Sequence, residues 1–137
     1  MDYFKIFDWS VEFSKRVLPF LKKKKFLLII DDNPDDAKLL ELCLTINNCT
    51  FDTAYSAEEA VGMLHIKNYH VAFVDLRLPH MDGWELIKVI RKHSPKTRIV
   101  ITAAELHDLT HIETGFYVGL IRKPVTVKGI REAMRYL

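Results

Sequence analysis

The sequence of 137 residues predicts an α/β domain built on a doubly wound five-stranded parallel sheet, preceded by an extra N-terminal helix. The main observation is that short apolar runs alternate with segments of helical periodicity from residue 26 to residue 137. A second observation is that polar residues follow these runs, where open parallel sheets form their binding sites. With 49% hydrophobic and 28% charged residues, the chain also has the composition of a globular domain.

The five expected strands are short apolar segments. Residues 26–30 form an uninterrupted apolar run, as expected of a strand that is buried on both faces. The full set of expected strands is residues 26–30, 51–55, 70–74, 98–101 and 117–121. Because helical segments alternate with them, the connections should be right-handed crossovers whose helices cover both faces of the sheet.

Five helical segments are expected between and after these strands. Pro34 suits the first turn of a helix, and Ser56 can cap the next one, with Glu59 three residues further on. In the helix after Pro34, apolar residues recur at helical spacing, namely Leu39, Leu40, Cys43, Leu44 and Ile46. The helix after Ser56 should bury Ala60, Met63 and Leu64. The remaining helices are expected at residues 84–93, at residues 105–114, where apolar residues are few, and at residues 126–137.

The first 25 residues differ in character from residues 26–137, and we expect them to form a separate extension. When residues 2–18 are placed on a helix, Lys5, Asp8, Glu12, Lys15 and Arg16 fall within one arc of about 100°, and a wide, aromatic-rich apolar surface is left. Pro19 should end this helix, and Lys22–Lys25 should form a basic linker. We expect the apolar surface to dock on the chain's own domain, a second copy in a homodimer, a protein partner or a membrane surface, with protein packing favoured over lipid.

Charge and cysteine usage narrow the function classes. Residues 1–25 carry a net charge of +4 and residues 26–137 a net charge of −2, so nucleic acid is not an expected partner of the folded part. Cys43 and Cys49 lack the spacing of a metal site, and Cys43 should be a buried free thiol. No apolar run reaches the roughly 18 residues of a membrane span. These features predict a cytoplasmic protein that is at most peripheral at a membrane.

Five polar residues follow the expected strands and should therefore meet at one edge of the sheet. They are Asp31 and Asp32 after the first strand, Asp75 after the third, Thr102 after the fourth and Lys123 after the fifth. Carboxylates brought together repel one another, and Mg²⁺, which prefers oxygen ligands, would relieve that repulsion. With a metal and a lysine nearby, Asp75 could attack a phosphoryl group while Thr102 and Lys123 contact its oxygens. Each residue alone fits an ordinary turn or strand end, so the prediction of a phosphoryl-accepting site rests on their combination.

Together with the motifs around them, these residues resemble the receiver domain of two-component response regulators. The motifs are Asp31-Asp32, Asp75 with Leu78-Pro79 and Met81-Asp82-Gly83, Thr102-Ala103, and Lys123-Pro124. The resemblance covers residues 26–137 and implies the flavodoxin-like receiver fold. It also implies a signalling module rather than an enzyme, in which Asp75 accepts a phosphoryl group from a histidine kinase or a histidine phosphotransfer protein.

The resemblance further implies roles for the other site residues. Mg²⁺ would be bound by Asp32, Asp75 and the backbone carbonyl of Arg77, with Asp31 acting through water. Thr102 and Lys123 would contact the phosphoryl group and couple it to the surface that binds a downstream protein target. Since the chain ends directly after the last expected helix, we expect a stand-alone receiver that acts through protein contacts or passes the phosphate onward.

Leu120, three residues before Lys123, departs from the family pattern. Many family members carry Tyr or Phe there, whose ring moves with the threonine, and leucine has no such ring. The departure leaves open a second function, a pseudo-receiver that binds proteins as a scaffold without phosphate control. An aspartyl-phosphate phosphatase of another fold is a more distant alternative, because Asp75-Leu76-Arg77 lacks a second acid two residues on. His107 and His111 have the helical i, i+4 spacing of a metal pair, but two surface histidines without a third ligand are the favoured interpretation.

Overall fold

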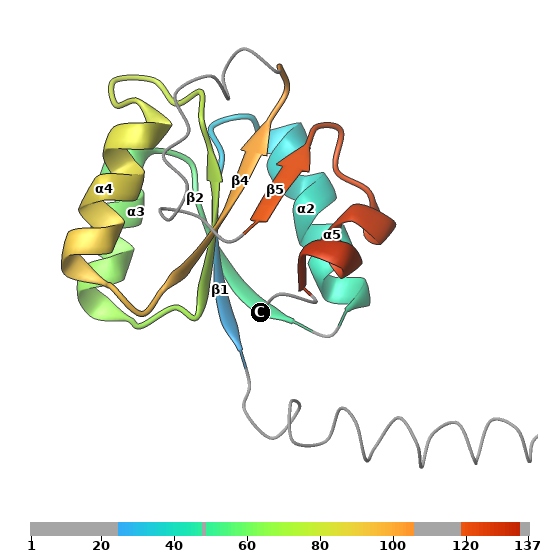
Figure 1. The fold of residues 1–137 in the computed structure, drawn as a ribbon, viewed down its shortest axis with the longest axis horizontal. Coiled ribbons are helices and arrows are strands. Elements are labelled where there is room, and N and C mark those ends of the chain that lie inside the picture. Colours follow the sequence, from blue (N-terminus) through green and yellow to red (C-terminus); the bar gives the residue numbers. More distant parts are fainter. Residues whose placement is uncertain (1–24, 48, 106–118, 135–137) are drawn as a thin grey trace, which may run out of the picture.

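Five parallel strands form one sheet in the order β2-β1-β3-β4-β5 (Figure 1). The computed structural model describes residues 25–47, 49–105 and 119–134 of the chain. The strands are β1 (Phe26–Ile30), β2 (Thr50–Ala54), β3 (Val71–Asp75), β4 (Arg98–Ala103) and β5 (Gly119–Arg122). The doubly wound five-stranded parallel sheet that the sequence predicts is therefore confirmed.

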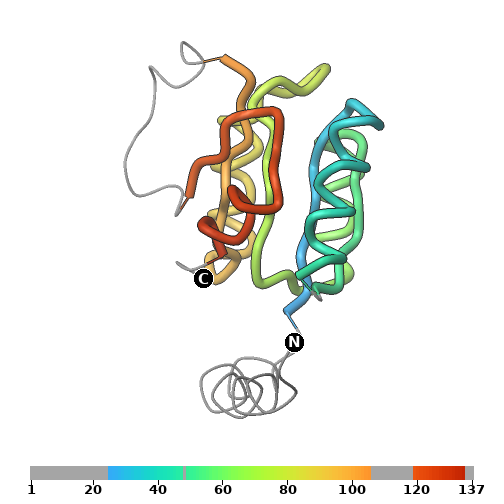
Figure 2. The backbone as a smooth tube through the Cα atoms, turned by 90° about the vertical axis from the view of Figure 1, so that its right-hand side faces the viewer, coloured from blue at the N-terminus to red at the C-terminus, as the bar shows by residue number. Residues whose placement is uncertain are grey.

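Two of the described helices cover each face of the sheet. α2 (Pro34–Ile46) and α5 (Val127–Met134) lie on one face, and α3 (Ala57–Ile66) and α4 (Gly83–His93) lie on the other (Figures 1 and 2). Within the described ranges, no helix combines the length and the apolar character needed to cross a membrane.

Several predicted features fall outside the part of the chain that the structure describes. These are the N-terminal helix at residues 2–18, the histidines His107 and His111, and residues 106–114 of the weakly apolar helix. Glu105, where that helix was expected to begin, is described and is not helical.

The three central strands β1, β3 and β4 have two buried faces because their side chains alternate between two separate cores. Leu28 and Ile30 of β1 point into the core formed with α3 and α4, whereas Leu27 and Ile29 point into the core formed with α2 and α5. Phe73 of β3 is fully buried in the second core. This double burial explains why the strand segments are continuous apolar runs instead of alternating patterns.

Two of the polar site residues lie at the ends of strands and take part in the backbone pairing. β3 runs to Asp75, one residue further than expected, and β4 runs to Ala103, so that it includes Thr102. Asp75 and Thr102 are partners in the β3–β4 register, and the Leu76 N–H donates to the Thr102 carbonyl at 3.3 Å. Backbone pairing therefore continues beyond the end of the apolar run. A sequence pattern detects the apolar run, but it does not detect this extra pairing.

Only some of the regularly spaced apolar residues of α2 face the sheet. Its buried residues are Ala37, Leu40, Cys43 and Leu44, and Cys43 is the expected buried free thiol. Leu39 and Ile46, which share the helical spacing, are exposed. The reason is that α2 carries apolar residues on two sides, and Ala37, Leu40 and Leu44 alone complete the stripe that faces the sheet.

The start of α3 agrees with its predicted cap. The Ser56 hydroxyl accepts a hydrogen bond from the Glu59 N–H at 3.1 Å, and the Glu59 carboxylate accepts from the Tyr55 N–H at 3.1 Å. Ala60 is buried as expected, whereas Met63 and Leu64 are only partly buried against the core.

Gly83 allows α4 to begin directly against the end of β3. The Asp82 carboxylate accepts a hydrogen bond from the Trp84 N–H, and the Gly83 N–H donates to the Leu76 carbonyl at 3.1 Å. A Cβ atom at position 83 would lie 2.5 Å from the Leu76 Cα and 2.6 Å from the Asp75 carbonyl oxygen. Only glycine permits this close approach of two backbones next to Asp75.

We therefore expect Gly83→Ala to lower the free energy of unfolding by roughly 1–3 kcal/mol, because the backbone around Leu76 must shift. Gly62→Ala is the matched control, since a Cβ atom on this exposed glycine of α3 would meet no atom within 4 Å. It should raise the free energy of unfolding by about 0.5–1 kcal/mol through helix propensity. Urea titration measures both changes, and an equal effect of the two substitutions would contradict the steric argument.

Candidate functional site

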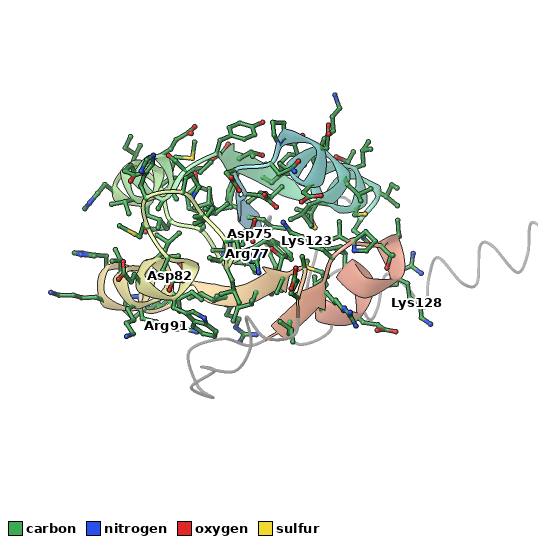
Figure 3. The ribbon with its side chains drawn as sticks, turned by 90° about the horizontal axis from the view of Figure 1, so that it is seen from above. Asp75, Arg77, Asp82, Arg91, Lys123 and Lys128 are labelled. Atoms are coloured by element: carbon green, nitrogen blue, oxygen red, sulfur yellow. The ribbon has the colours of Figure 1, made fainter. Side chains whose placement is uncertain are left out.

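The candidate site lies above the carboxyl ends of the central strands. In the view from above, Asp75, Arg77 and Lys123 lie near the centre of the sheet, whereas Asp82 and Arg91 belong to the α4 side and Lys128 to the α5 side (Figure 3). Asp75 ends β3, and Lys123 directly follows β5. The strand order therefore brings these two residues together, although 48 positions separate them in the sequence.

Lys123 joins carboxylates from three different elements. Its Nζ lies 2.9 Å from Asp31 Oδ2, which follows β1, and 3.0 Å from Asp75 Oδ2, which ends β3. It also lies 3.0 Å from Asp36 Oδ2 in the first turn of α2. One ammonium group thus donates to three carboxylates, which is the full donor capacity of a lysine.

The two buried carboxylates are held in the same way. Asp31 Oδ1 accepts a hydrogen bond from the Asn33 N–H at 3.0 Å, and Asp75 Oδ1 accepts from the Arg77 N–H at 3.0 Å. In each case the backbone N–H two residues further on fixes one oxygen, while Lys123 contacts the other. These contacts orient both carboxylates toward a common point at the edge of the sheet.

Asp32 completes an acidic cluster with these two residues. Asp31, Asp32 and Asp75 each offer a carboxylate oxygen, and the three oxygens lie within 4.8 Å of one another. Asp31 and Asp75 are buried, whereas Asp32 is exposed to solvent. A cluster of hard oxygen donors with one open side has the ligand chemistry that suits Mg²⁺, which keeps several of its waters.

The site contains more negative charge than Lys123 can balance. Burial raises the pKa of Asp31 to about 6, and the nearby Asp75 adds to this rise, although the hydrogen bonds from Lys123 and the Asn33 N–H oppose it. Burial would lower the pKa of Lys123, but the hydrogen bonds to Asp31, Asp75 and Asp36 outweigh it and raise that pKa. Burial therefore dominates the shift of the Asp31 pKa, whereas the three carboxylates dominate the shift of the Lys123 pKa.

Thr102 and Arg77 border this cluster. Thr102 is buried and pairs with Asp75 in the β3–β4 register. The exposed side chain of Arg77 lies 3.9 Å from the carboxylate of Glu105, and its backbone N–H contacts Asp75. The structure thus brings the sequence-predicted residues to one place at the carboxyl edge of the sheet.

Asp36 is the site residue that the sequence analysis missed. The Asn33 side chain caps α2 by accepting from the Asp35 and Asp36 N–H groups at 2.9 and 3.2 Å, which fixes the turn that carries Asp36. A signal was present, because Asp36 precedes the buried Leu40 and Leu44 by one and two helical turns. Helical periodicity therefore places Asp36 at the top of the inward-facing stripe, next to Asp31.

Comparison with known proteins adds independent information. A family model described as the response regulator receiver domain matches residues 27–135. The probable transcriptional regulator ycf27 of Guillardia theta is 31% identical over 118 residues, which cover 84% of this chain and 46% of that protein. The transcriptional regulatory protein GlrR of Escherichia coli (strain K12) is 35% identical over 114 residues, which cover 82% of this chain and 26% of that protein. The chain thus spans less than half the length of these two relatives.

Solved structures show the same likeness. The response regulator protein TrrA of Thermotoga maritima, in a crystal structure in complex with Mg(2+)-BeF, is 25% identical with a TM-score of 0.75, covering 82% of this chain and 99% of that chain. The chemotaxis response regulator CheY4 of Vibrio cholerae is 20% identical with a TM-score of 0.75, covering 84% of this chain and 100% of that chain. The second likeness supports the fold alone.

Replacing Asp31 by Asn should stabilise the metal-free protein at neutral pH. Burial raises the pKa of Asp31 from its ordinary 3.8 to about 6, so the folded state binds this proton more tightly than the unfolded state does. The cost of ionising the buried group is absent below the unfolded pKa, builds as the pH rises from about 4 to about 6, and is fully present above that range. We expect Asp31→Asn to raise the free energy of unfolding by roughly 1–3 kcal/mol at about pH 7.

Urea titrations in the presence of a chelator measure this effect across the pH range. The gain should shrink as the pH falls toward about 4, where Asp31 is already protonated in the folded state. Asp36→Asn is the control, because it removes a partly exposed carboxylate from the same lysine and should give no comparable gain. A wild-type protein more stable than Asp31→Asn at about pH 7 would contradict the burial argument.

Proposed function

The chain belongs to the response regulator receiver family, and on this premise we propose that it is a phosphorylatable signalling module whose phosphoryl acceptor is Asp75. A receiver domain is a signalling module and not an enzyme. The observation that best supports the role of Asp75 is its position, 3.0 Å from Lys123 and within the acidic cluster formed with Asp31 and Asp32.

The proposed site includes a divalent cation. An acidic triad of this kind is typical of the Mg²⁺ site of receiver domains, and the oxygen donors of Asp31, Asp32 and Asp75 fit that ion. Asp32, Asp75 and the backbone carbonyl of Arg77 would hold the ion, with Asp31 acting through water. When bound, the ion supplies positive charge that neutralises phosphoryl oxygens. The exposure of Asp32 leaves this side of the cluster open to solvent.

The chain's own residues would carry out the transfer as follows. A carboxylate oxygen of Asp75 attacks the phosphorus atom, an acyl phosphate P–O bond forms, and the P–N bond to the donor histidine breaks. The electron pair of that bond stays on the leaving imidazole. Lys123, already 3.0 Å from Asp75, would neutralise one phosphoryl oxygen, and the Thr102 hydroxyl would donate a hydrogen bond to another. The phosphoryl donor would be a histidine kinase or a histidine phosphotransfer protein.

The output would be a contact with a downstream protein. Lys123 holds Asp31, Asp36 and Asp75 together, so a phosphoryl group on Asp75 would redistribute its hydrogen bonds. Such a change in the cluster would reach β4 through Thr102, which pairs with Asp75. The segment that follows Thr102 would then carry the change to the protein surface.

A second candidate function rests on Leu120. Its side chain lies in β5 and is 42% exposed, at the position where many receivers carry an aromatic ring. Without that ring, the domain could bind its partner as a pseudo-receiver, independently of phosphate. Phosphorylation of Asp75 distinguishes the two functions, because a pseudo-receiver would not accept a phosphoryl group there.

Incubation with Mg²⁺ and a small-molecule phosphodonor should add one phosphoryl group to the wild-type chain, as measured by intact-protein mass spectrometry. Asp75→Asn should abolish the gain, because an amide is not a nucleophile for this transfer. Asp82→Asn is the matched control, since Asp82 is an exposed aspartate that only caps α4. Addition of a chelator should also abolish the gain. An equal mass gain in Asp75→Asn rules out the acceptor, and no gain in the wild type favours the pseudo-receiver.

Phosphorylation should change hydrogen exchange in the segment that follows Thr102 more than in β5, because Leu120 offers no ring to move. Exchange measured by mass spectrometry with and without phosphodonor gives this comparison. Leu120→Tyr is the informative variant, since a restored aromatic side chain should increase the response of β5. Strong new protection centred on β5 in the wild type, with no change after Thr102, would contradict this expectation.

A further inference from the structure

The outer side of α2 carries an apolar stripe that the fold does not use. Leu39, Leu42 and Ile46 are 37%, 54% and 62% exposed, and their i, i+3, i+7 spacing places them on one side of the helix. They are half of the large hydrophobic residues that are exposed within the described part of the chain. We call these three residues the α2 stripe.

Packing of the domain does not account for the α2 stripe. Ala37, Leu40 and Leu44 already fill the face of α2 that covers the sheet. Three apolar side chains aligned on the outer side of one helix therefore form a surface on which a further apolar segment can pack. A surface of this spacing fits the apolar face of another helix.

We propose that residues 2–18 dock on the α2 stripe of their own chain through their aromatic-rich face. This segment carries five aromatic residues, namely Tyr3, Phe4, Phe7, Trp9 and Phe13. When the segment is placed on a helix, five of its charged residues fall within one arc of about 100°, namely Lys5, Asp8, Glu12, Lys15 and Arg16, so the opposite side is mostly apolar and can pack on the stripe.

The chain enters β1 at the end of α2 that carries Ile46. β1 and β2 pair in parallel from Phe26 and Thr50, so Lys25 and Cys49 occupy adjacent positions before the two strands. The Cys49 N–H donates to the Leu44 carbonyl at 3.0 Å, which ties this point to the last turn of α2. Figure 2 shows the start of β1 and the C-terminal end of α2 at the same end of the domain. The segment is therefore attached beside the surface that we assign to it.

The lengths match. A helix over residues 2–18 would be about 25 Å long, and the 13 residues of α2 span about 20 Å. Residues 19–25, which include Pro19, can bridge up to about 23 Å when extended. This connection is long enough for the segment to turn back and lie along α2.

Charge favours this occupant over an anionic membrane. α2 carries three acidic residues and one lysine, a net charge of −2, whereas residues 1–21 are neutral and Lys22–Lys25 add a charge of +4. The last turn of α2 also contains no basic residue to meet its exposed carbonyl groups, and Lys25, the last residue of the basic run Lys22–Lys25, precedes β1 at that end. An anionic lipid surface would be repelled by α2. The short tether also gives the segment of the same chain a higher local concentration than a second copy has.

Hydrogen exchange of the full-length chain tests the proposal. In the wild type, the amides of residues 3–18 should exchange roughly tenfold or more slowly than in urea. The double substitution Leu42→Gln with Ile46→Gln should remove that protection, and glutamine keeps the helix propensity of these exposed positions. Ile66→Gln is the matched control, because Ile66 is 89% exposed on α3, and it should leave the protection unchanged.

The alternative occupants give different results. Docking within one chain predicts a monomer in light scattering, with the same protection at every protein concentration. Protection that is lost on dilution would assign the segment to a second copy and overturn the proposal. Protection that appears only with vesicles of phosphatidylcholine and phosphatidylserine would assign it to lipid, with the same consequence. Unprotected residues 3–18, or protection that survives the double substitution, would also overturn it.

Discussion

The fold and the site depend on one interaction, the contact of the Lys123 ammonium group with three carboxylates. Lys123 follows β5, an edge strand, and its side chain reaches past the end of β4 to Asp75 on β3 and Asp31 after β1. Its third contact, with Asp36, fixes the start of α2 to the same point. Buried carboxylates require such a partner, because an unpaired charge in the interior costs far more than an exposed one. The lysine thereby links four elements that lie far apart in the sequence.

The same interaction leaves the site short of positive charge. The site holds four carboxylates, those of Asp31, Asp32, Asp36 and Asp75, and one ammonium group, which contacts three of them; burial raises the pKa of Asp31 in spite of the hydrogen bond from Lys123. A domain selected for stability alone would not retain this imbalance, since replacing a poorly balanced buried charge is often neutral or stabilising. The imbalance has a use if the site must bind a cation and then a phosphoryl group, because the missing charge creates affinity for the ion.

The sequence predicted the strands and the main site residues, because both leave local patterns. A strand buried on both faces is an unbroken apolar run, and a polar residue at its end is easily located. Asp36 was missed because its role depends on a helical turn in three dimensions, where it lies above Leu40 and Leu44. The sequence did not show which face of α2 is buried, because Leu39 and Ile46 are as apolar as the residues that pack. Periodicity shows that a helix has apolar stripes, but it does not show which of two stripes meets the sheet.

The central claim is that Asp75, and no other carboxylate of the cluster, accepts the phosphoryl group. Borohydride reduction tests it most directly, because it converts an acyl phosphate of aspartate to homoserine and leaves free carboxylates unchanged. After treatment with phosphodonor and Mg²⁺, peptide mass spectrometry should find homoserine at position 75, and the chelator-treated sample should contain none. Homoserine at position 31, 32 or 36, or at no position, would contradict the account.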